Sequence, residues 1–242
     1  MLIQKRIDDF TMNLNIEDGG ISRVLYHQGG REKAFMSLLK ETVQEGMVCL
    51  DLGGNIGYTT LPMLKNVGPT GFVYAVEPDS QSIGILRKNV EDNGYNDRCE
   101  VIECAISDQD GTVEFWEASK PNLSSVKKNK YSTTKRDVPC YSLNTFLQDR
   151  RYPNFIKMDV EGHEVKIFEG GLDYFSKNEG HTNILLEVHP NTYDKDNDFE
   201  KILREYFKLG FNSKWVIATP IPQPTLFKMA GYSPIRTIHT DG

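Results

Sequence analysis

Residues 47–61 of the chain read "MVCLDLGGNIGYTTL", an apolar run followed by a glycine-rich turn and a stretch with helical spacing. The apolar run predicts a buried strand, and the residues from 58 onward predict a helix. Glycine permits positive φ angles and lets the backbone approach a ligand closely. Because the first N–H groups of a helix point at whatever lies before it, the stretch predicts a ligand-binding strand–turn–helix unit.

The spacing of the glycines distinguishes between two kinds of cofactor. A dinucleotide fingerprint needs glycines at the first, third and sixth positions, and this turn fails that test whether it is counted from Gly53 or from Gly54. The turn instead carries an Asp-x-Gly-x-x-x-Gly pattern, formed by Asp51, Gly53 and Gly57, with Asn55 between the glycines. An acidic residue at a strand end suits a cationic ligand, which favours S-adenosylmethionine and places these four residues at the cofactor.

A second acidic residue follows the next predicted strand. Glu77 ends the run "GFVYAVEP" and lies 20 positions after Gly57, where an acidic side chain typically accepts the ribose hydroxyls of a nucleoside. Asp79 is predicted to cap the following helix. Ala105, at the end of the run "CEVIECAI", is expected beside the adenine ring, although plain core packing explains it equally well.

Strand and helix patterns alternate from residue 46 onward, which predicts an α/β fold with a doubly wound, mostly parallel, Rossmann-like sheet. Right-handed crossovers then place helices on both faces of the sheet. We expect residues 1–45 to form N-terminal strands and a helix that pack on the core, and residues 46–242 to form the main domain. Within the first segment, residues 21–27 alternate like a strand, and residues 213–240 suggest a terminal hairpin.

Composition excludes several classes of protein. The 242 residues carry a formal net charge of −6, which disfavours a non-specific nucleic-acid binder. The four cysteines form no Cys-x-x-Cys pair, and no stretch approaches the roughly 20 apolar residues of a membrane span. We therefore expect a cytoplasmic protein. The lysine-bearing loop over residues 119–136 suits either a solvated loop or a substrate lid.

Five stretches together resemble the FkbM family of S-adenosylmethionine-dependent methyltransferases. In chain order they are "VCLDLGGNIGYTTL", "VYAVEPD", "VIECAISDQDGTVEF", "FIKMDVEGHEVKIFEGG" and "ILLEVHP". The resemblance implies a seven-stranded class I methyltransferase sheet with an antiparallel final hairpin, and methyl transfer to a hydroxyl of a sugar, glycolipid or polyketide. Two positions depart from the expected pattern: Gly54 stands where alanine is common, and Pro62 must lie in the first helical turn or kink the helix.

The candidate catalytic residues follow two later strands. Alternation along "FIKMDVEG" puts Lys157 and Asp159 on one face, and alternation along "ILLEVHP" puts Glu187 and His189 on one face. If these strands are neighbours, Asp159, Glu161, Glu187 and His189 converge beside the methyl group. Either Asp159 or His189 would then act as general base, while the other acids orient substrate hydroxyls.

Two other interpretations of these residues remain open. Asp159, Glu187 and His189 would also suit a divalent cation such as Mg²⁺, although we do not expect a metal to be required. Glu164 is expected only to start a helix, where acidic side chains are favoured. Lys157 would in that case form an ion pair with Asp159.

We therefore expect an S-adenosylmethionine-dependent O-methyltransferase that acts on a hydroxylated small molecule or glycan. Two alternatives remain: an RNA 2′-O-methyltransferase, because Lys157, Asp159 and Glu187 loosely resemble the lysine and acids of such enzymes, and a protein that binds the cofactor without catalysis. His163 lacks the second histidine of a His-Glu-x-x-His zinc site, so it is not expected to bind a metal.

Overall fold

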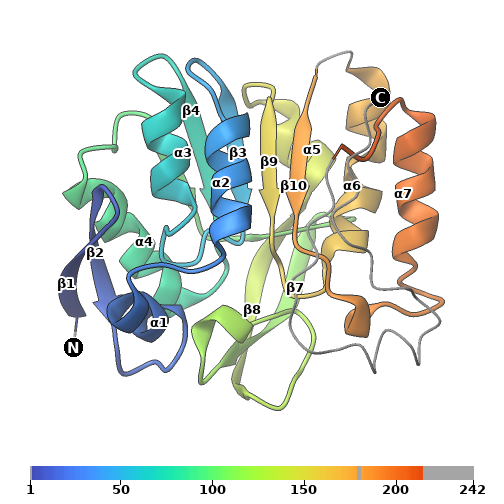
Figure 1. The fold of residues 1–242 in the computed structure, drawn as a ribbon. Coiled ribbons are helices and arrows are strands. Elements are labelled where there is room, and N and C mark those ends of the chain that lie inside the picture. The colour runs from blue at the N-terminus through green and yellow to red at the C-terminus, as the bar shows by residue number, and fades with distance from the viewer. Residues whose placement is uncertain (1, 179–180, 215–242) are drawn as a thin grey trace.

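The computed structural model describes residues 2–178 and 181–214 (Figure 1). Its central sheet has five parallel strands in the order β10–β9–β3–β4–β5. This confirms the predicted doubly wound, parallel architecture. The predicted terminal hairpin, which would complete a seven-stranded sheet, lies almost wholly outside the described residues. The five strands are β3 (Val48–Leu52), β4 (Phe72–Val76), β5 (Cys99–Ile102), β9 (Phe155–Met158) and β10 (Asn183–Leu186).

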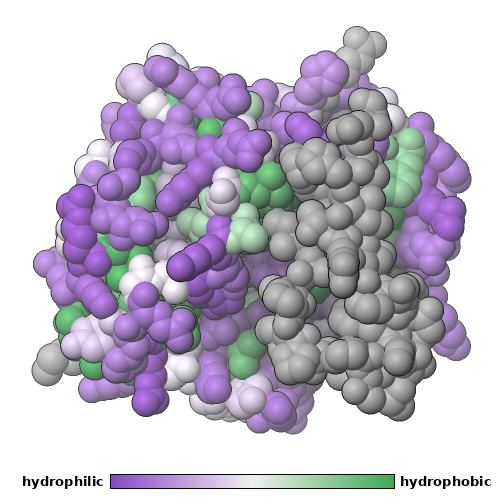
Figure 2. Space-filling view, viewed as in Figure 1, coloured by the Kyte–Doolittle hydropathy of each residue, from purple (hydrophilic) through white to green (hydrophobic). Residues whose placement is uncertain are grey.

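Helices cover both faces of this sheet because successive strand residues point to opposite sides. In β3, Cys49 joins the apolar cluster on one side, whereas Leu50 and Leu52 join the cluster on the other. No helix among the described residues is long and apolar enough to cross a membrane. The face seen in Figure 2 is mostly hydrophilic where it is described. Helices that follow strands β3, β4, β9 and β10 in the chain are α3 (Thr60–Val67), α4 (Ser80–Asp92), α6 (Glu164–Lys177) and α7 (Phe199–Lys208).

The N-terminal segment forms an antiparallel hairpin and two helices: β1 (Leu2–Ile7), β2 (Phe10–Asn15), α1 (Ile21–Gln28) and α2 (Lys33–Thr42). The hairpin is joined to α4, where Asn89 Oδ1 accepts hydrogen bonds from Asn13 N at 2.6 Å and Asn13 Nδ2 at 2.9 Å. The predicted strand over residues 21–27 is wrong, because that segment is α1. Its apolar residues also fit helical spacing, which eight residues are too few to tell from alternation.

A second, three-stranded sheet follows β5. It contains β6 (Ala105–Ser107), β7 (Gly111–Ala118) and β8 (Ser132–Ser142), and β8 pairs antiparallel with β7 and parallel with β6. The short helix α5 (Leu143–Gln148) continues from β8. Residues 119–131 connect β7 to β8. Part of the loop predicted over residues 119–136 therefore lines the cavity described below, and its last residues belong to β8.

The turn after β3 has no room for a side chain at its first glycine. Gly53 has a φ of +79°, and a Cβ there would lie 2.0 Å from the backbone oxygen of Asp159. The ends of β3 and β9 are also joined by a hydrogen bond from Asp159 N to Leu52 O at 3.1 Å. Pro62 is the third residue of α3, so it lies in the first turn, where a missing N–H costs little.

This contact makes Gly53→Ala a direct test of the turn. The substitution forces an alanine into a left-handed conformation and against the Asp159 carbonyl. We expect it to lower the free energy of unfolding by about 2–5 kcal/mol, the sum of backbone strain and overpacking. Urea denaturation of the variant and the unchanged protein measures the difference.

Gly54→Ala is the matched control. A Cβ at Gly54 would lie 3.1 Å from Cδ2, at the end of the Leu86 side chain, and the backbone there does not have a positive φ. We expect a loss below about 1.5 kcal/mol. Equal losses for the two variants would contradict the steric account of the turn.

Candidate functional site

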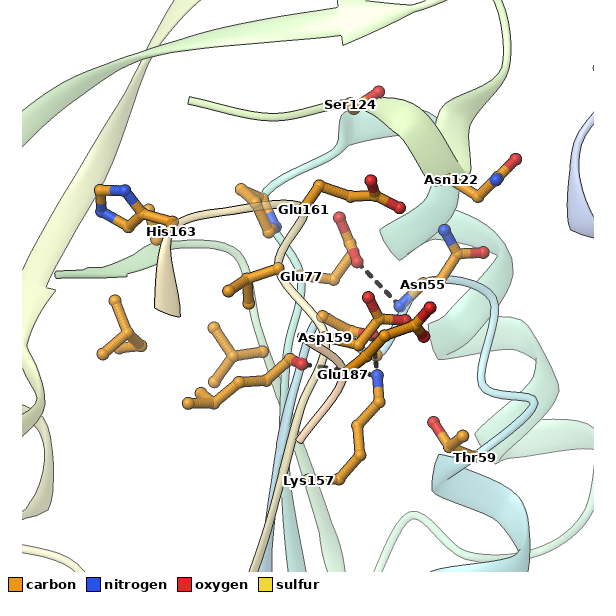
Figure 3. A pocket seen from close by; sticks show the side chains of 18 of the residues that line it. Asn55, Thr59, Glu77, Asn122, Ser124, Lys157, Asp159, Glu161, His163 and Glu187 are labelled. Carbon is orange, nitrogen blue, oxygen red and sulfur yellow. Dashed lines mark hydrogen bonds between the residues drawn. The ribbon is translucent and has the colours of Figure 1, made fainter. Parts of the chain in front are cut away.

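A cavity opens at the carboxyl ends of the parallel strands, where ligands of such sheets bind (Figure 3). Its volume is about 1020 Å³, including the part open to solvent. The glycine turn after β3 forms one wall. Four carboxylates from the ends of three strands also line the cavity: Glu77 after β4, Asp159 and Glu161 after β9, and Glu187 after β10. The sheet order therefore brings together side chains that lie more than 100 residues apart in the chain.

Glu77 is buried at the cavity wall. Its Oε2 accepts a hydrogen bond from Asn55 N at 2.8 Å, and its Oε1 accepts one from Asp79 N at 2.7 Å. Burial, offset only in part by these N–H groups, raises the pKa of Glu77 to about 8. Asp79 caps α4 as predicted, because its side chain accepts from Gln81 N and Ser82 N.

Asp51 occupies a different place from the one expected. It is fully buried beneath the turn and is not among the described residues that line the cavity. Its Oδ2 accepts hydrogen bonds from Thr59 Oγ1 at 3.0 Å and Thr60 Oγ1 at 2.7 Å. Its other oxygen lies 3.3 Å from Lys157 Nζ. Asp51 therefore supports the turn from below, because Lys157 Nζ in turn donates to Gly53 O at 2.6 Å.

Lys157 is thus paired with Asp51, and the ion pair expected between Lys157 and Asp159 is replaced by this one. Asp159 is left facing the cavity, with its side chain 29% exposed. Part of the cavity wall is apolar, and it includes Ala105, Ile106 and the buried Phe115.

His189 lies at the centre of a charged cluster. Its Nδ1 is 2.8 Å from Glu164 Oε1, and its Nε2 is 3.7 Å from Glu161 Oε2 and 3.8 Å from Asp159 Oδ1. Burial would lower the pKa of His189, but the hydrogen bond and charge of Glu164, with the charges of Glu161 and Asp159, outweigh it and raise the pKa to about 9. The ring is therefore a cation at neutral pH.

Glu164 is a functional candidate that the sequence analysis missed. It is fully buried and accepts hydrogen bonds from Gly162 N at 3.1 Å, His189 Nδ1 at 2.8 Å and Tyr193 Oη at 3.1 Å. Burial would raise its pKa, but the bond to His189 and its charge lower the pKa below its usual range. Starting the helix, the role expected from the sequence, does not account for the bonds of Glu164 to His189 and Tyr193. Helical spacing could have revealed this burial, because Glu164 shares a face with the core residue Phe168.

Glu161 is held in an unusual backbone conformation. Its φ is +53°, in the left-handed region that residues other than glycine seldom adopt. Burial, and then the charge of Asp159, raise the pKa of Glu161 to about 7. The same two causes raise the pKa of Glu187. In Figure 3, Glu161, Asp159 and Glu187 extend toward the same space from the ends of β9 and β10.

The loop over residues 119–131 is fixed to both sides of this cluster. Ser125 Oγ donates to Glu161 O at 3.2 Å, and Lys127 Nζ donates to Thr192 O at 2.7 Å. Ser124 Oγ donates to Asp79 Oδ2 at 2.9 Å. Pro121, Asn122, Ser124 and Val126 line the cavity, so the loop covers it rather than extending into solvent as a free segment.

His163 also lines the cavity, but its ring is bound to Ser107. Its Nε2 is 2.9 Å from Ser107 Oγ, and its ring points away from Glu161 and Asp159 in Figure 3. Burial lowers the pKa of His163 to about 4, so the ring is neutral.

The sheet and the position of its cavity define a class I methyltransferase fold. The Methyltransferase FkbM domain matches residues 51–213, and the chain belongs to the FkbM methyltransferase family.

Curated relatives match shorter parts of the chain. The tRNA wybutosine-synthesizing protein 2 homolog of Rattus norvegicus is 46% identical over 56 residues, which are 23% of this chain and 13% of that protein. The protein-L-isoaspartate O-methyltransferase of Methanothrix thermoacetophila is 32% identical over 84 residues, which are 35% of this chain and 37% of that protein. The chain thus spans well under half the length of these curated relatives.

Solved structures with a similar fold include other methyltransferases. Methyltransferase FkbM from Methylobacillus flagellatus has a TM-score of 0.41 and 17% identity, over 67% of this chain and 42% of that one. The S-adenosylmethionine-dependent O-methyltransferase of Thermotoga maritima has a TM-score of 0.43 and 13% identity, over 90% of this chain and 64% of that one.

The bond between Glu164 and His189 leads to a prediction that needs no substrate. Glu164→Gln removes the negative charge that raises the pKa of His189, while burial continues to lower it. We expect the pKa of His189 to fall from about 9 toward its usual value of about 6.5, because the charges of Glu161 and Asp159 still raise it. Titration of the ring by NMR measures the change.

Glu169→Gln, an exposed position on the same helix, is the control and should leave the pKa of His189 unchanged. A histidine that still titrates near 9 in the Glu164→Gln protein would contradict the assigned partner.

Proposed function

We propose that the chain is an S-adenosylmethionine-dependent O-methyltransferase that methylates a hydroxyl of a sugar, glycolipid or other small metabolite. Membership of the FkbM family supports the reaction class. The observation that carries the proposal is the cluster of Asp159 and Glu161 with the cation of His189. Asp159 and Glu161 line the cavity at the end of β9, and Glu187 lines it at the end of β10.

The walls of the cavity suggest how the cofactor binds. Glu77 suits the two ribose hydroxyls, because its carboxylate lies at the end of β4 and lines the cavity. The apolar wall at Ala105 suits adenine. The methionine tail then extends toward Gly53, which brings the sulfonium close to Asp159. Negative charge there stabilises the cationic methyl donor.

In the proposed reaction the acceptor oxygen attacks the methyl carbon in line with the bond to sulfur. The C–O bond forms as the C–S bond breaks, the electron pair stays on sulfur, and the hydroxyl proton passes to a carboxylate. The expected alternative, with His189 as the base, does not fit a pKa of about 9, because the ring already holds its proton. Glu161, with a pKa of about 7, is the better base, and Asp159 and Glu187 orient the acceptor.

These pKa values predict a bell-shaped dependence of kcat/KM on pH. Glu161 accepts a proton only when ionised, so activity should rise as the pH passes about 7. His189 holds the neighbouring carboxylates only when protonated, so activity should fall as the pH passes about 9. Glu161→Gln should lower turnover by about 10²–10⁴-fold and remove the rising limb.

Glu200→Gln, at an exposed position on α7, is the control for this experiment and should retain the full profile. A rising limb that persists near pH 7 in the Glu161→Gln protein would assign the proton transfer to another group.

The cluster also fits a divalent ion, because ligand atoms of Asp159, Glu161 and His189 lie within 4.8 Å of one another. We favour the reaction without a metal, since a protonated His189 balances the carboxylates and offers no lone pair. Turnover should therefore be unchanged after dialysis against EDTA, whereas loss of activity that Mg²⁺ restores would make the ion part of the mechanism.

Cofactor choice is tested by calorimetry. The protein should bind S-adenosylmethionine and not NAD. Glu77→Ala should weaken the binding of S-adenosylmethionine by about 10- to 100-fold, because the hydrogen bonds from the two ribose hydroxyls are lost. Glu91→Ala, an exposed position on α4, is the control. Binding of NAD with similar affinity would refute the interpretation of the glycine spacing.

The acceptor is tested by transfer of a labelled methyl group to sugars, glycolipids and RNA. Labelled sugar or glycolipid supports the proposal, and labelled RNA alone would favour the alternative of RNA 2′-O-methylation. A protein that binds the cofactor and labels nothing in a broad panel would support the non-catalytic alternative.

A further inference from the structure

Arg31 brings a positive charge to the cavity from outside the part of the chain that matches the family domain. That match covers residues 51–213, whereas Arg31 lies in the connection between α1 and α2. Arg31 and its neighbour Glu32 both line the cavity. The N-terminal segment therefore contributes to the site as well as to the core.

The backbone of Arg31 is fixed to the glycine turn. A single hydroxyl, that of Tyr58, accepts a hydrogen bond from Arg31 N and donates one to Arg31 O, each at 3.0 Å. Tyr58 immediately follows Gly57 at the end of the turn. Glu32 has a φ of +51°, a conformation that costs about 1–3 kcal/mol and is concentrated at functional sites. The position of Arg31 is therefore set by the same turn that would hold the cofactor.

Arg31 lines the part of the cavity where the proposed binding mode would place the methionine tail. If Glu77 holds the ribose and adenine lies against Ala105, the amino-acid tail extends from β4 past β3 toward β9 and β10. Tyr58 places the backbone of Arg31 beside the residues that follow β3. The positive charge of Arg31 also opposes the rise in the pKa of Glu187, which lies at the end of β10.

Two basic side chains, Arg31 and Lys157, occur among the described residues of the cavity wall. Arg31 has N–H donors available for a ligand. Lys157 is buried and already surrounded by Asp51 Oδ1, Gly53 O and Leu52 O. Arg31 is about one-third exposed and pairs with Glu32 through Nη2. A guanidinium has five N–H donors in a planar fork, so further donors remain for an anion.

We propose that Arg31 binds the α-carboxylate of the methionine tail of S-adenosylmethionine, so that the N-terminal segment completes the cofactor site. This inference rests on the proposed cofactor. It makes the amino-acid tail, as well as the nucleoside, a determinant of affinity. An arginine suits this task because its fork matches the two oxygens of a carboxylate.

The test compares two ligands that differ in the tail. S-adenosylhomocysteine carries the α-carboxylate, whereas 5′-methylthioadenosine keeps the adenine, ribose and sulfur and lacks the whole amino-acid group. In calorimetric titrations Arg31→Ala should weaken the binding of S-adenosylhomocysteine by about 10- to 100-fold, the loss expected for a hydrogen bond to a charged group. The affinity for 5′-methylthioadenosine should be unchanged. Arg31→Lys, which keeps the charge without the fork, should give an intermediate loss.

Arg23→Ala is the matched control, because Arg23 is an exposed arginine on α1 in the same segment. It should leave both affinities unchanged. Thermal unfolding of each variant shows whether the protein remains folded.

Three results would overturn the inference. Equal weakening of both ligands by Arg31→Ala would mean that Arg31 only shapes the cavity. An unchanged affinity for S-adenosylhomocysteine would exclude contact with the tail, and a raised KM for the acceptor would then assign Arg31 to that substrate. Failure of the unchanged protein to bind either ligand would refute the proposed cofactor itself, and this outcome is distinguishable from the other two.

Discussion

The buried ion pair between Asp51 and Lys157 supports the rest of the site. Their side chains are 0% and 3% exposed, and the pair joins the adjacent strands β3 and β9. Burial would lower the pKa of Lys157, but the charge of Asp51 keeps the ammonium protonated and raises the pKa. Removing one partner of such a pair typically costs about 3–5 kcal/mol, because the other charge stays buried alone. The glycine turn depends on this pair, since Lys157 also donates to Gly53 O.

From the pair of Asp51 and Lys157 toward His189, positive and negative side chains alternate. Asp51 neutralises Lys157, which leaves Asp159 directed into the cavity. Glu164 neutralises His189, whose second nitrogen faces Asp159 and Glu161. Asp51 and Glu164 thus each have a partner of opposite sign. Glu77 is held instead by the backbone N–H groups of Asn55 and Asp79.

The sequence was sufficient for the parallel strands, the cap at Asp79 and the gathering of acids at the strand ends, because periodicity and element ends determine these features. It was insufficient to predict that Lys157 pairs with Asp51, because alternation along a strand shows which face of the sheet a side chain is on and not which residue it contacts. It also misassigned α1, because a short segment fits two periods. The protonation of His189 follows from the buried Glu164, a contact across 25 residues that no local pattern records.

The loop over residues 119–131 both lines the cavity and holds the backbone of Glu161. Its Ser125 hydroxyl holds the carbonyl of Glu161, and its Lys127 holds the turn that follows His189 through Thr192. A movement of this loop large enough to admit a bulky molecule would break both bonds and free the backbone that positions the acids. Under the proposed function, rebuilding the loop to admit a different acceptor would also disturb Glu161, so acceptor range and turnover would change together.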